Sequence, residues 1–175
     1  MYGVIKQKGL LKMNLKINEF NTDLEYAAKD SLFTNFYSNF FTGIKTIKFV
    51  EDLETQKKGI DKIITFNNGH IITIDEKKRR KDYNDILIEI YKNKGLKRKG
   101  WLYYTEADFI AYGMEDTKRV FLINTLRLQE LYYMNEEKWL SYKPLYSYNP
   151  GYVTENRAIS IKELKYCIIA VFEEL

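Results

Sequence analysis

The residues best suited to chemistry are two carboxylates and one ammonium that lie on either side of a turn. Asp61 comes just before an apolar run that ends at Phe66, whereas Asp75 and Lys77 end the apolar run that begins after Gly69. Two carboxylates held close together repel each other unless a cation lies between them. The residue types therefore indicate a site in which both carboxylates hold a divalent metal ion and the lysine faces a substrate anion.

A β-hairpin is the element that must position these side chains. Asn67-Asn68-Gly69 between two apolar runs is a strong turn signal, and it predicts arms over residues 58–66 and 70–78. Antiparallel arms pair outward from the turn, which places Asp61 directly opposite Asp75. Opposite residues share a sheet face with their Cβ atoms about 4.5–5.5 Å apart. Because side chains alternate along a strand, the lysine two positions after Asp75 joins them on that face.

The same residues also have ordinary structural interpretations. Asp61 beside Gly59 suits a turn, and Asp75 with Lys77 suits the solvated face of an edge strand. Against this, the isoleucine-rich arms indicate that both faces of the hairpin are covered. Acids at the ends of buried strands are costly unless they are paired or used.

The rest of the chain predicts the surroundings of the hairpin. A first helix begins at the capping residues 21–23 and ends near Gly43. Helix first, antiparallel strands next and mixed elements last favour an α/β fold with a central mixed sheet. The remaining expected elements are strands over 44–50, 85–91, 101–105 and 119–123, a helix over 126–141, an aromatic loop over 145–152, a short helix opened by Ser160 and Glu163, and a strand or helix over 167–175.

Asp61 together with Asp75-Glu76-Lys77 resembles the core of the PD-(D/E)XK nuclease superfamily, in which a hairpin supplies an Asp and a (D/E)-x-K element. The segments 56–61 (QKKGID) and 85–89 (DILIE), with Gly100-Trp101, are similar to a small phage and bacterial branch of it. The resemblance covers about residues 20–125, and it has Ile60 rather than Pro before Asp61. It implies a single domain over 1–175 with a restriction-endonuclease-like core, a central mixed sheet flanked by helices, and a C-terminal helical and aromatic extension over 126–175.

The resemblance also implies an activity, that of a nuclease that hydrolyses phosphodiester bonds with Mg²⁺ or Mn²⁺. The backbone carbonyl of Glu76 adds a metal ligand to the two aspartates, and Lys77 orients the water or neutralises the phosphate. Glu25 of the first helix and Glu89 of the strand over 85–91 are alternative acids to complete the site. The expected catalytic set is therefore Asp61, Asp75, Lys77, Glu25 and Glu89, and the expected metal set is Asp61, Asp75 and Glu76.

Basic and aromatic residues suggest where a nucleic acid would lie. Phosphate contact is one interpretation of the basic clusters and solubility is the other. The tyrosines of the aromatic loop either pack on the surface or stack on bases. The residues concerned are the substrate contacts Gln56, Lys78, Arg79, Arg80, Lys97 and Arg98, and the tyrosines Tyr146, Tyr148 and Tyr152.

Composition bounds the remaining possibilities. The chain has 175 residues, a formal net charge of +4 and one cysteine. A single cysteine excludes a disulfide framework and a cysteine-based zinc site, and it suits a reducing cytoplasm. No apolar run approaches membrane-spanning length. DNA is the expected partner, RNA is the alternative, and a homodimer is compatible with double-strand cutting. The competing function is an inactive binding domain of the same fold.

Overall fold

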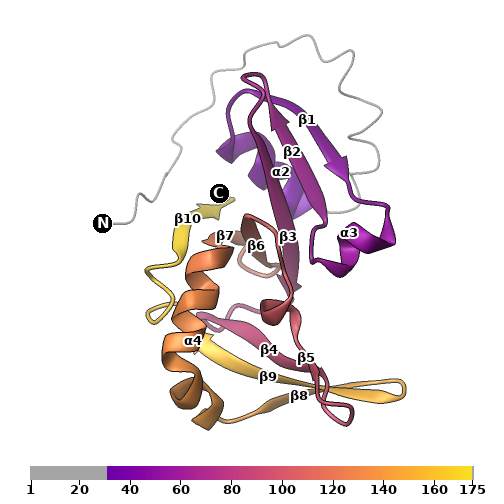
Figure 1. Ribbon diagram of the computed structural model, residues 1–175. Coiled ribbons are helices and arrows are strands. Elements are labelled where there is room, and N and C mark those ends of the chain that lie inside the picture. The colour runs from indigo at the N-terminus through magenta and orange to yellow at the C-terminus, as the bar shows by residue number, and fades with distance from the viewer. Residues whose placement is uncertain (1–30, 175) are drawn as a thin grey trace.

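The computed structural model describes residues 31–174, and most of its strands form one mixed sheet (Figure 1). This six-stranded sheet has the order β1-β2-β3-β6-β7-β10. All neighbours in it are antiparallel except β3 and β6, which are parallel. Its strands are β1 (Ile44–Phe49), β2 (Lys62–Phe66), β3 (Ile71–Arg79), β6 (Phe109–Met114), β7 (Arg119–Asn124) and β10 (Ile168–Glu173).

The predicted hairpin and its register are confirmed in β2 and β3. Lys62 pairs with Ile74 and Ile64 pairs with Ile72, as pairing outward from residue 68 requires. The loop closes with the Phe66 amide donating to the His70 carbonyl at 2.8 Å. Gly69 has φ +82°, the left-handed conformation that ends a three-residue hairpin loop.

A second sheet, which the sequence did not predict, lies below the first in Figure 1. It has the order β5-β4-β9-β8, with β4 (Asp85–Asn93), β5 (Arg98–Lys99), β8 (Leu145–Asn149) and β9 (Tyr152–Ser160). The strand expected over 85–91 exists as β4, and it belongs to this second sheet rather than lying beside the hairpin. β6 takes that place, and the crossover that parallel strands need is made by β4, β5 and a short 3₁₀ helix, η1 (Trp101–Tyr103).

Three other expected elements are wrong. Residues 101–105 begin with η1 rather than a strand, because Gly100 brings the backbone against β4 and the chain must turn. Residues 145–152 form most of a hairpin rather than a loop, since Pro150-Gly151 makes the turn and Gly151 has φ +83°. Ser160 Oγ does contact Glu163, at 3.4 Å, but the chain continues in turns and reaches β10 without a helix.

Each face of the six-stranded sheet is covered by a different layer. Helix α2 (Ser31–Phe40) packs on one face, where Phe36 and Tyr37 join Ile64 and Ile74 in a buried cluster. The four-stranded sheet and helix α4 (Thr125–Ser141, capped by the Asn124 side chain) cover the other face. The α/β class with a mixed sheet is therefore confirmed, and a second sheet stands where flanking helices were expected.

The C-terminal part contributes to both layers. β9 pairs with β4, and β10 pairs with β7 at the edge of the large sheet. Residues 126–174 thus supply strands to the two sheets, although the sequence had indicated an extension of the core. Within residues 31–174, no helix is long and apolar enough to cross a membrane.

Gly100 is required by a close approach between two backbones. A Cβ atom at this position would lie 1.8 Å from the Glu89 carbonyl oxygen of β4. The neighbouring Trp101 amide donates to the Glu89 side chain at 3.2 Å, so the approach also fixes a candidate site residue. Any side chain here would push η1 away from β4.

We expect Gly100→Ala to lower the free energy of unfolding by about 3 kcal/mol or more, because rigid backbone has to move to relieve the overlap. Gly95→Ala is the matched control, since its Cβ would meet the nearest atom at 3.6 Å, an ordinary contact. Urea unfolding of both variants measures the difference. Equal stabilities of the two variants would contradict the close approach.

Candidate active site

Asp61 is held at the start of β2 by hydrogen bonds on both sides. Its amide donates to the Ile74 carbonyl of β3 at 2.9 Å, and its carbonyl accepts from Val50 at 3.0 Å, next to the end of β1. The chain reaches it through a helix that the sequence interpretation missed, α3 (Leu53–Lys57). The local signals were present, because the Asp52 side chain caps the helix at the Thr55 amide.

The hairpin brings the two aspartates together one position beyond the Lys62–Ile74 pair. Asp75 is 0% exposed, and its Oδ1 accepts a hydrogen bond from Lys77 Nζ. Asp61 Oδ2 accepts from the Glu76 amide at 2.7 Å. Asp75 Oδ2 is buried and has no hydrogen-bond partner among residues 31–174. The three predicted residues therefore meet on one face, with one carboxylate oxygen unsatisfied.

Burial and charge both act on the Asp75 carboxyl. The pKa of Asp75 is raised to about 7, because its removal from water outweighs the opposing effect of Lys77 and the Asp61 carboxylate adds to the increase. A raised pKa means that the folded protein disfavours the charged form of this group. A cation beside the unsatisfied oxygen would reverse that preference.

The second sheet adds an acid to the same place. Burial raises the pKa of the Glu89 carboxyl of β4, and the charge of Lys77 opposes this increase. Tyr104, which follows η1, was not predicted as a site residue. Its pKa is raised to about 12 by burial and by the charges of Glu89, Asp75 and Asp61. The site therefore lies where the two sheets meet, a position that no local sequence pattern signals.

Glu76 turns its side chain to the opposite face of the large sheet. Its carboxylate accepts from Lys62 Nζ at 2.9 Å and from the Tyr37 hydroxyl at 2.7 Å. Its backbone carbonyl remains on the side of Lys77, whose Nζ lies 3.4 Å away. As a metal ligand, Glu76 could therefore contribute only that carbonyl.

The donor set fits a hard divalent ion in part. Two aspartates and a backbone carbonyl offer oxygen atoms, which Mg²⁺ and Mn²⁺ prefer, and Mg²⁺ is often held by only one or two carboxylates. The unsatisfied Asp75 oxygen is the observation that supports the fit. Within the described residues, no three His, Cys, Asp or Glu side chains are grouped to hold a metal. Glu25 lies outside the described residues.

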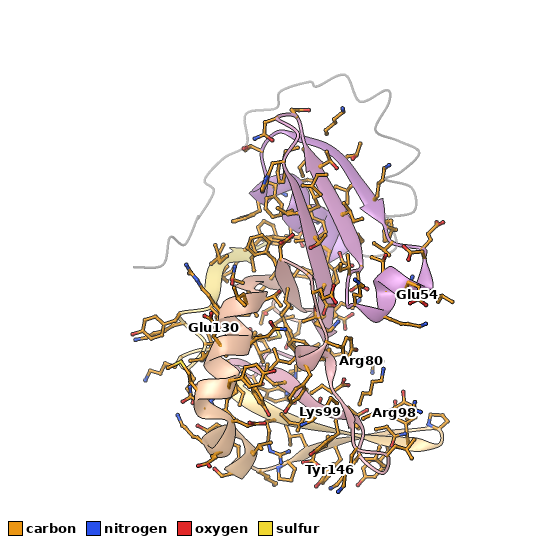
Figure 2. All side chains as sticks on the ribbon, in the orientation of Figure 1. Glu54, Arg80, Arg98, Lys99, Glu130 and Tyr146 are labelled. Atoms are coloured by element: carbon orange, nitrogen blue, oxygen red, sulfur yellow. The ribbon has the colours of Figure 1, made fainter. Side chains whose placement is uncertain are left out.

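Some of the predicted nucleic-acid contacts have a partner for their side chain among residues 31–174, and the others have none there. Lys78 pairs with Glu115 at 2.9 Å, and Arg79 pairs with Asp85. Gln56 donates to the Val50 carbonyl at 2.8 Å, which ties α3 to the end of β1. Arg80, Lys97 and Arg98 are exposed, and Figure 2 shows Arg80 and Arg98 on the same side of the molecule as Glu54.

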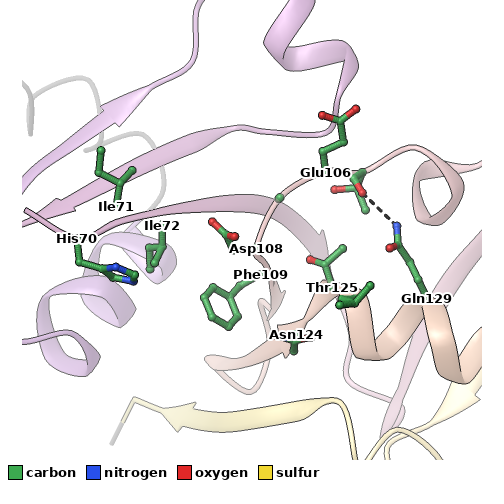
Figure 3. Close-up of a pocket in the computed structure, with 12 residues that line it drawn as sticks. His70, Ile71, Ile72, Glu106, Asp108, Phe109, Asn124, Thr125 and Gln129 are labelled. Atoms are coloured by element: carbon green, nitrogen blue, oxygen red, sulfur yellow. Dashed lines mark hydrogen bonds between the residues drawn. The ribbon is translucent and has the colours of Figure 1, made fainter.

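A separate pocket of about 490 Å³ lies between the hairpin end and the start of α4 (Figure 3). Its Asp108 carboxylate accepts from the Thr73 amide and hydroxyl at 2.8 Å, and its Gln129 amide donates to the Thr105 carbonyl at 3.1 Å. Most of its polar groups are thus already paired within the protein. None of the predicted site residues lines it.

In EDTA, we expect Asp75→Asn to be more stable than the wild type at pH 8 by about 2–4 kcal/mol and equally stable near pH 4. The pKa of Asp75 is about 7 in the folded protein and 3.8 in the unfolded chain. As the pH rises from 3.8 to 7, the unfolded chain ionises Asp75 more readily than the folded protein does, so the wild type loses free energy of unfolding. Urea unfolding across this pH range measures the difference between the two proteins.

Glu54→Gln, which removes a carboxylate whose side chain is 83% exposed, should show no such pH-dependent gain. A difference between Asp75→Asn and wild type that stays constant with pH would contradict the buried, disfavoured charge.

Comparisons of the chain with protein-family models, curated proteins and solved structures give no match. The chemistry of this site therefore has to follow from its own side chains. The side chains of the site are a pair of aspartates with one unsatisfied oxygen and a lysine on the same face of the large sheet. Glu89 of β4 and Tyr104, which follows η1, join them from the other layer.

Proposed function

We propose that the protein is a metal-dependent nuclease that hydrolyses phosphodiester bonds, with DNA as its preferred substrate. One observation carries the proposal: the buried Asp75 keeps an unsatisfied oxygen beside a second carboxylate, on the face where Lys77 lies. The resemblance of Asp61 and Asp75-Glu76-Lys77 to the PD-(D/E)XK motif supports it. The hairpin followed by a parallel strand supports the restriction-endonuclease-like relationship that we propose with it.

The roles of the residues follow from their positions. Asp61 and Asp75 would hold Mg²⁺ or Mn²⁺ with the Glu76 carbonyl, and either Glu89 or Glu25 would complete the set. A cation held there would supply an activated water and neutralise charge on the phosphate. Lys77 would direct its ammonium to the phosphate or to the attacking water. Tyr104 would remain protonated at neutral pH, since its pKa is near 12, and could donate a hydrogen bond.

An inactive nucleic-acid-binding domain of the same fold is the second candidate. The observation that favours it is the lack of three grouped ligand side chains within residues 31–174. Against it, inactive relatives in the resembling superfamily usually lose the lysine or an acid, whereas this chain keeps all three. Measured cleavage and binding separate the two candidates.

We expect Asp75→Asn and Lys77→Ala each to slow cleavage by about a hundredfold or more, because each removes a group that acts on the phosphate or on its metal. Lys138→Ala is the control, since Lys138 is an exposed lysine of α4 that pairs with Glu163 and is not among the expected substrate contacts. Labelled single-stranded, double-stranded and branched DNA, and RNA, are incubated with each protein in Mg²⁺, Mn²⁺ or EDTA. Cleavage by Asp75→Asn at the wild-type rate, or cleavage that EDTA does not affect, would refute the proposal.

Metal binding has a separate readout in thermal stability. We expect millimolar Mg²⁺ or Mn²⁺ to raise the melting temperature of the wild type by about 2–4 °C, because a ligand that binds only the folded state stabilises it. Asp75→Asn should show no such increase. Sodium chloride of equal ionic strength controls for screening, and an equal increase with the sodium salt would argue against a metal site.

A further inference from the structure

A second candidate binding site lies in the four-stranded sheet, away from the aspartate pair. It is a cavity of about 600 Å³ between the β4–β5 turn and the β8–β9 hairpin, here called the tyrosine hollow. Its walls include Lys94, Gly95, Tyr146, Tyr148 and Tyr152, and none of its described lining residues is acidic. The sequence had left open whether these tyrosines pack on the surface or stay available.

The three tyrosines are available. Tyr146 is 39% exposed, Tyr148 is 81% exposed and Tyr152 is 44% exposed. None of the ring–ring contacts among residues 31–174 includes any of them, in contrast to the core tyrosines Tyr37 and Tyr132. Several exposed aromatic rings around one cavity are unusual in a surface that serves only solubility.

The hollow is held in shape before any ligand arrives. Lys94 Nζ donates to the Tyr146 hydroxyl at 2.8 Å and lies 4.2 Å from the ring centroid. Lys94 also pairs with Glu155 at 3.1 Å, which ties it to β9. The hairpin turn is fixed by Pro150-Gly151, so Tyr148 faces Val153 in a defined register. A fixed aromatic surface loses little entropy on binding.

The spacing of the rings suits a flat ligand. Tyr146 and Tyr148 alternate along β8 and therefore lie on the same face of the hairpin. Residues two apart on a strand are about 6.6 Å apart. That is close to twice the contact distance of about 3.5 Å between stacked carbon atoms. Tyr148, the most exposed of the three tyrosines, is therefore the ring best placed to stack on a planar ligand on this face.

Charge around the hollow selects an anion. The segment over residues 92–99 carries Lys92, Lys94, Lys97, Arg98 and Lys99 and no acid. Lys97 and Arg98 are exposed, and neither forms an ion pair with any described residue. The nearby Glu155 is neutralised by Lys94 and by Arg157, which lies 2.8 Å away.

We propose that the tyrosine hollow binds single-stranded nucleic acid, with an unpaired base stacked on Tyr148 and phosphates near Lys97 and Arg98. Exposed aromatic rings flanked by cations recognise unpaired bases, whereas a duplex hides its base faces within its own stack. A ligand that is anionic and also presents flat rings matches both features.

β4 connects the hollow to the candidate active site. It carries Glu89 near Asp75, and its C-terminal turn carries Lys94, about 17 Å further along an extended strand. Between them, Lys92 lies over the Tyr104 ring at 5.2 Å. The inference that the bound strand is also the substrate rests on the proposed nuclease function. The inference that the hollow binds a single strand does not depend on that function.

Fluorescence anisotropy of a labelled oligothymidylate in EDTA tests the binding without cleavage. We expect the single strand to bind the wild type at least about tenfold more tightly than a duplex of equal length. Tyr148→Ala should weaken binding of the single strand by about tenfold, and Tyr148→Phe should keep it, because the ring and not the hydroxyl stacks. Tyr166→Ala, which removes another exposed tyrosine, is the control and should bind as the wild type does.

The outcomes separate the two proposals. Binding that is lost in Tyr148→Ala and kept in Asp75→Asn supports the tyrosine hollow, whether or not the protein cuts. Absence of cleavage with this pattern intact would refute the nuclease alone. Equal binding of duplex and single strand, unchanged binding by Tyr148→Ala, or no binding of any nucleic acid would overturn the hollow, even if cleavage is observed.

Discussion

The constraint on which the site depends is a carboxylate kept out of water beside a second carboxylate. Asp75 is 0% exposed because β3 continues into the parallel pairing with β6, where Ile110 lies next to it in register. Among residues 31–174, Lys77 is the cation that pairs with it, and one of its oxygens has no hydrogen-bond partner. Burying such a group costs free energy unless something completes its interactions. The fold accepts this cost at the junction of two sheets, where Glu89 and Tyr104 also converge.

The neighbouring residue shows what a completed arrangement looks like in the same strand. Glu76 faces the α2 side and receives hydrogen bonds from Lys62 and Tyr37, so both its charge and its oxygens are satisfied. Consecutive residues of β3 thus carry one satisfied acid and one unsatisfied acid on opposite faces. The incomplete set at Asp75 is therefore a local property of the face that meets the second sheet, and a bound cation is the simplest group that would complete it.

The predictable parts of this fold are those set by short-range patterns. Asn68-Gly69 predicted the hairpin loop. The register counted outward from that loop predicted Asp61 opposite Asp75, and β2 and β3 follow this register as far as Lys62 and Ile74. The second sheet could not be predicted, because β4 pairs with β9 about seventy positions away, as Ile88 with Arg157 shows. Tyr104 entered the site only through that pairing and the close approach at Gly100. Helix α3 had its Asp52 cap, but residues 53–57 were assigned to no element, and the predicted arm over 58–66 forms a strand only from Lys62.

The charges near β8 also affect what the edge of the four-stranded sheet can bind. β8 is the edge strand of its sheet, and residues 145–153 carry no charged side chain, so the edge lacks the usual protection against pairing with another copy. The basic segment over 92–99 lies beside it, because Lys94 reaches Tyr146. Two copies meeting at this edge would bring their basic segments together and repel each other, whereas a polyanion would be attracted. The same cations would therefore oppose self-association at this edge and attract the polyanion that we propose as the ligand.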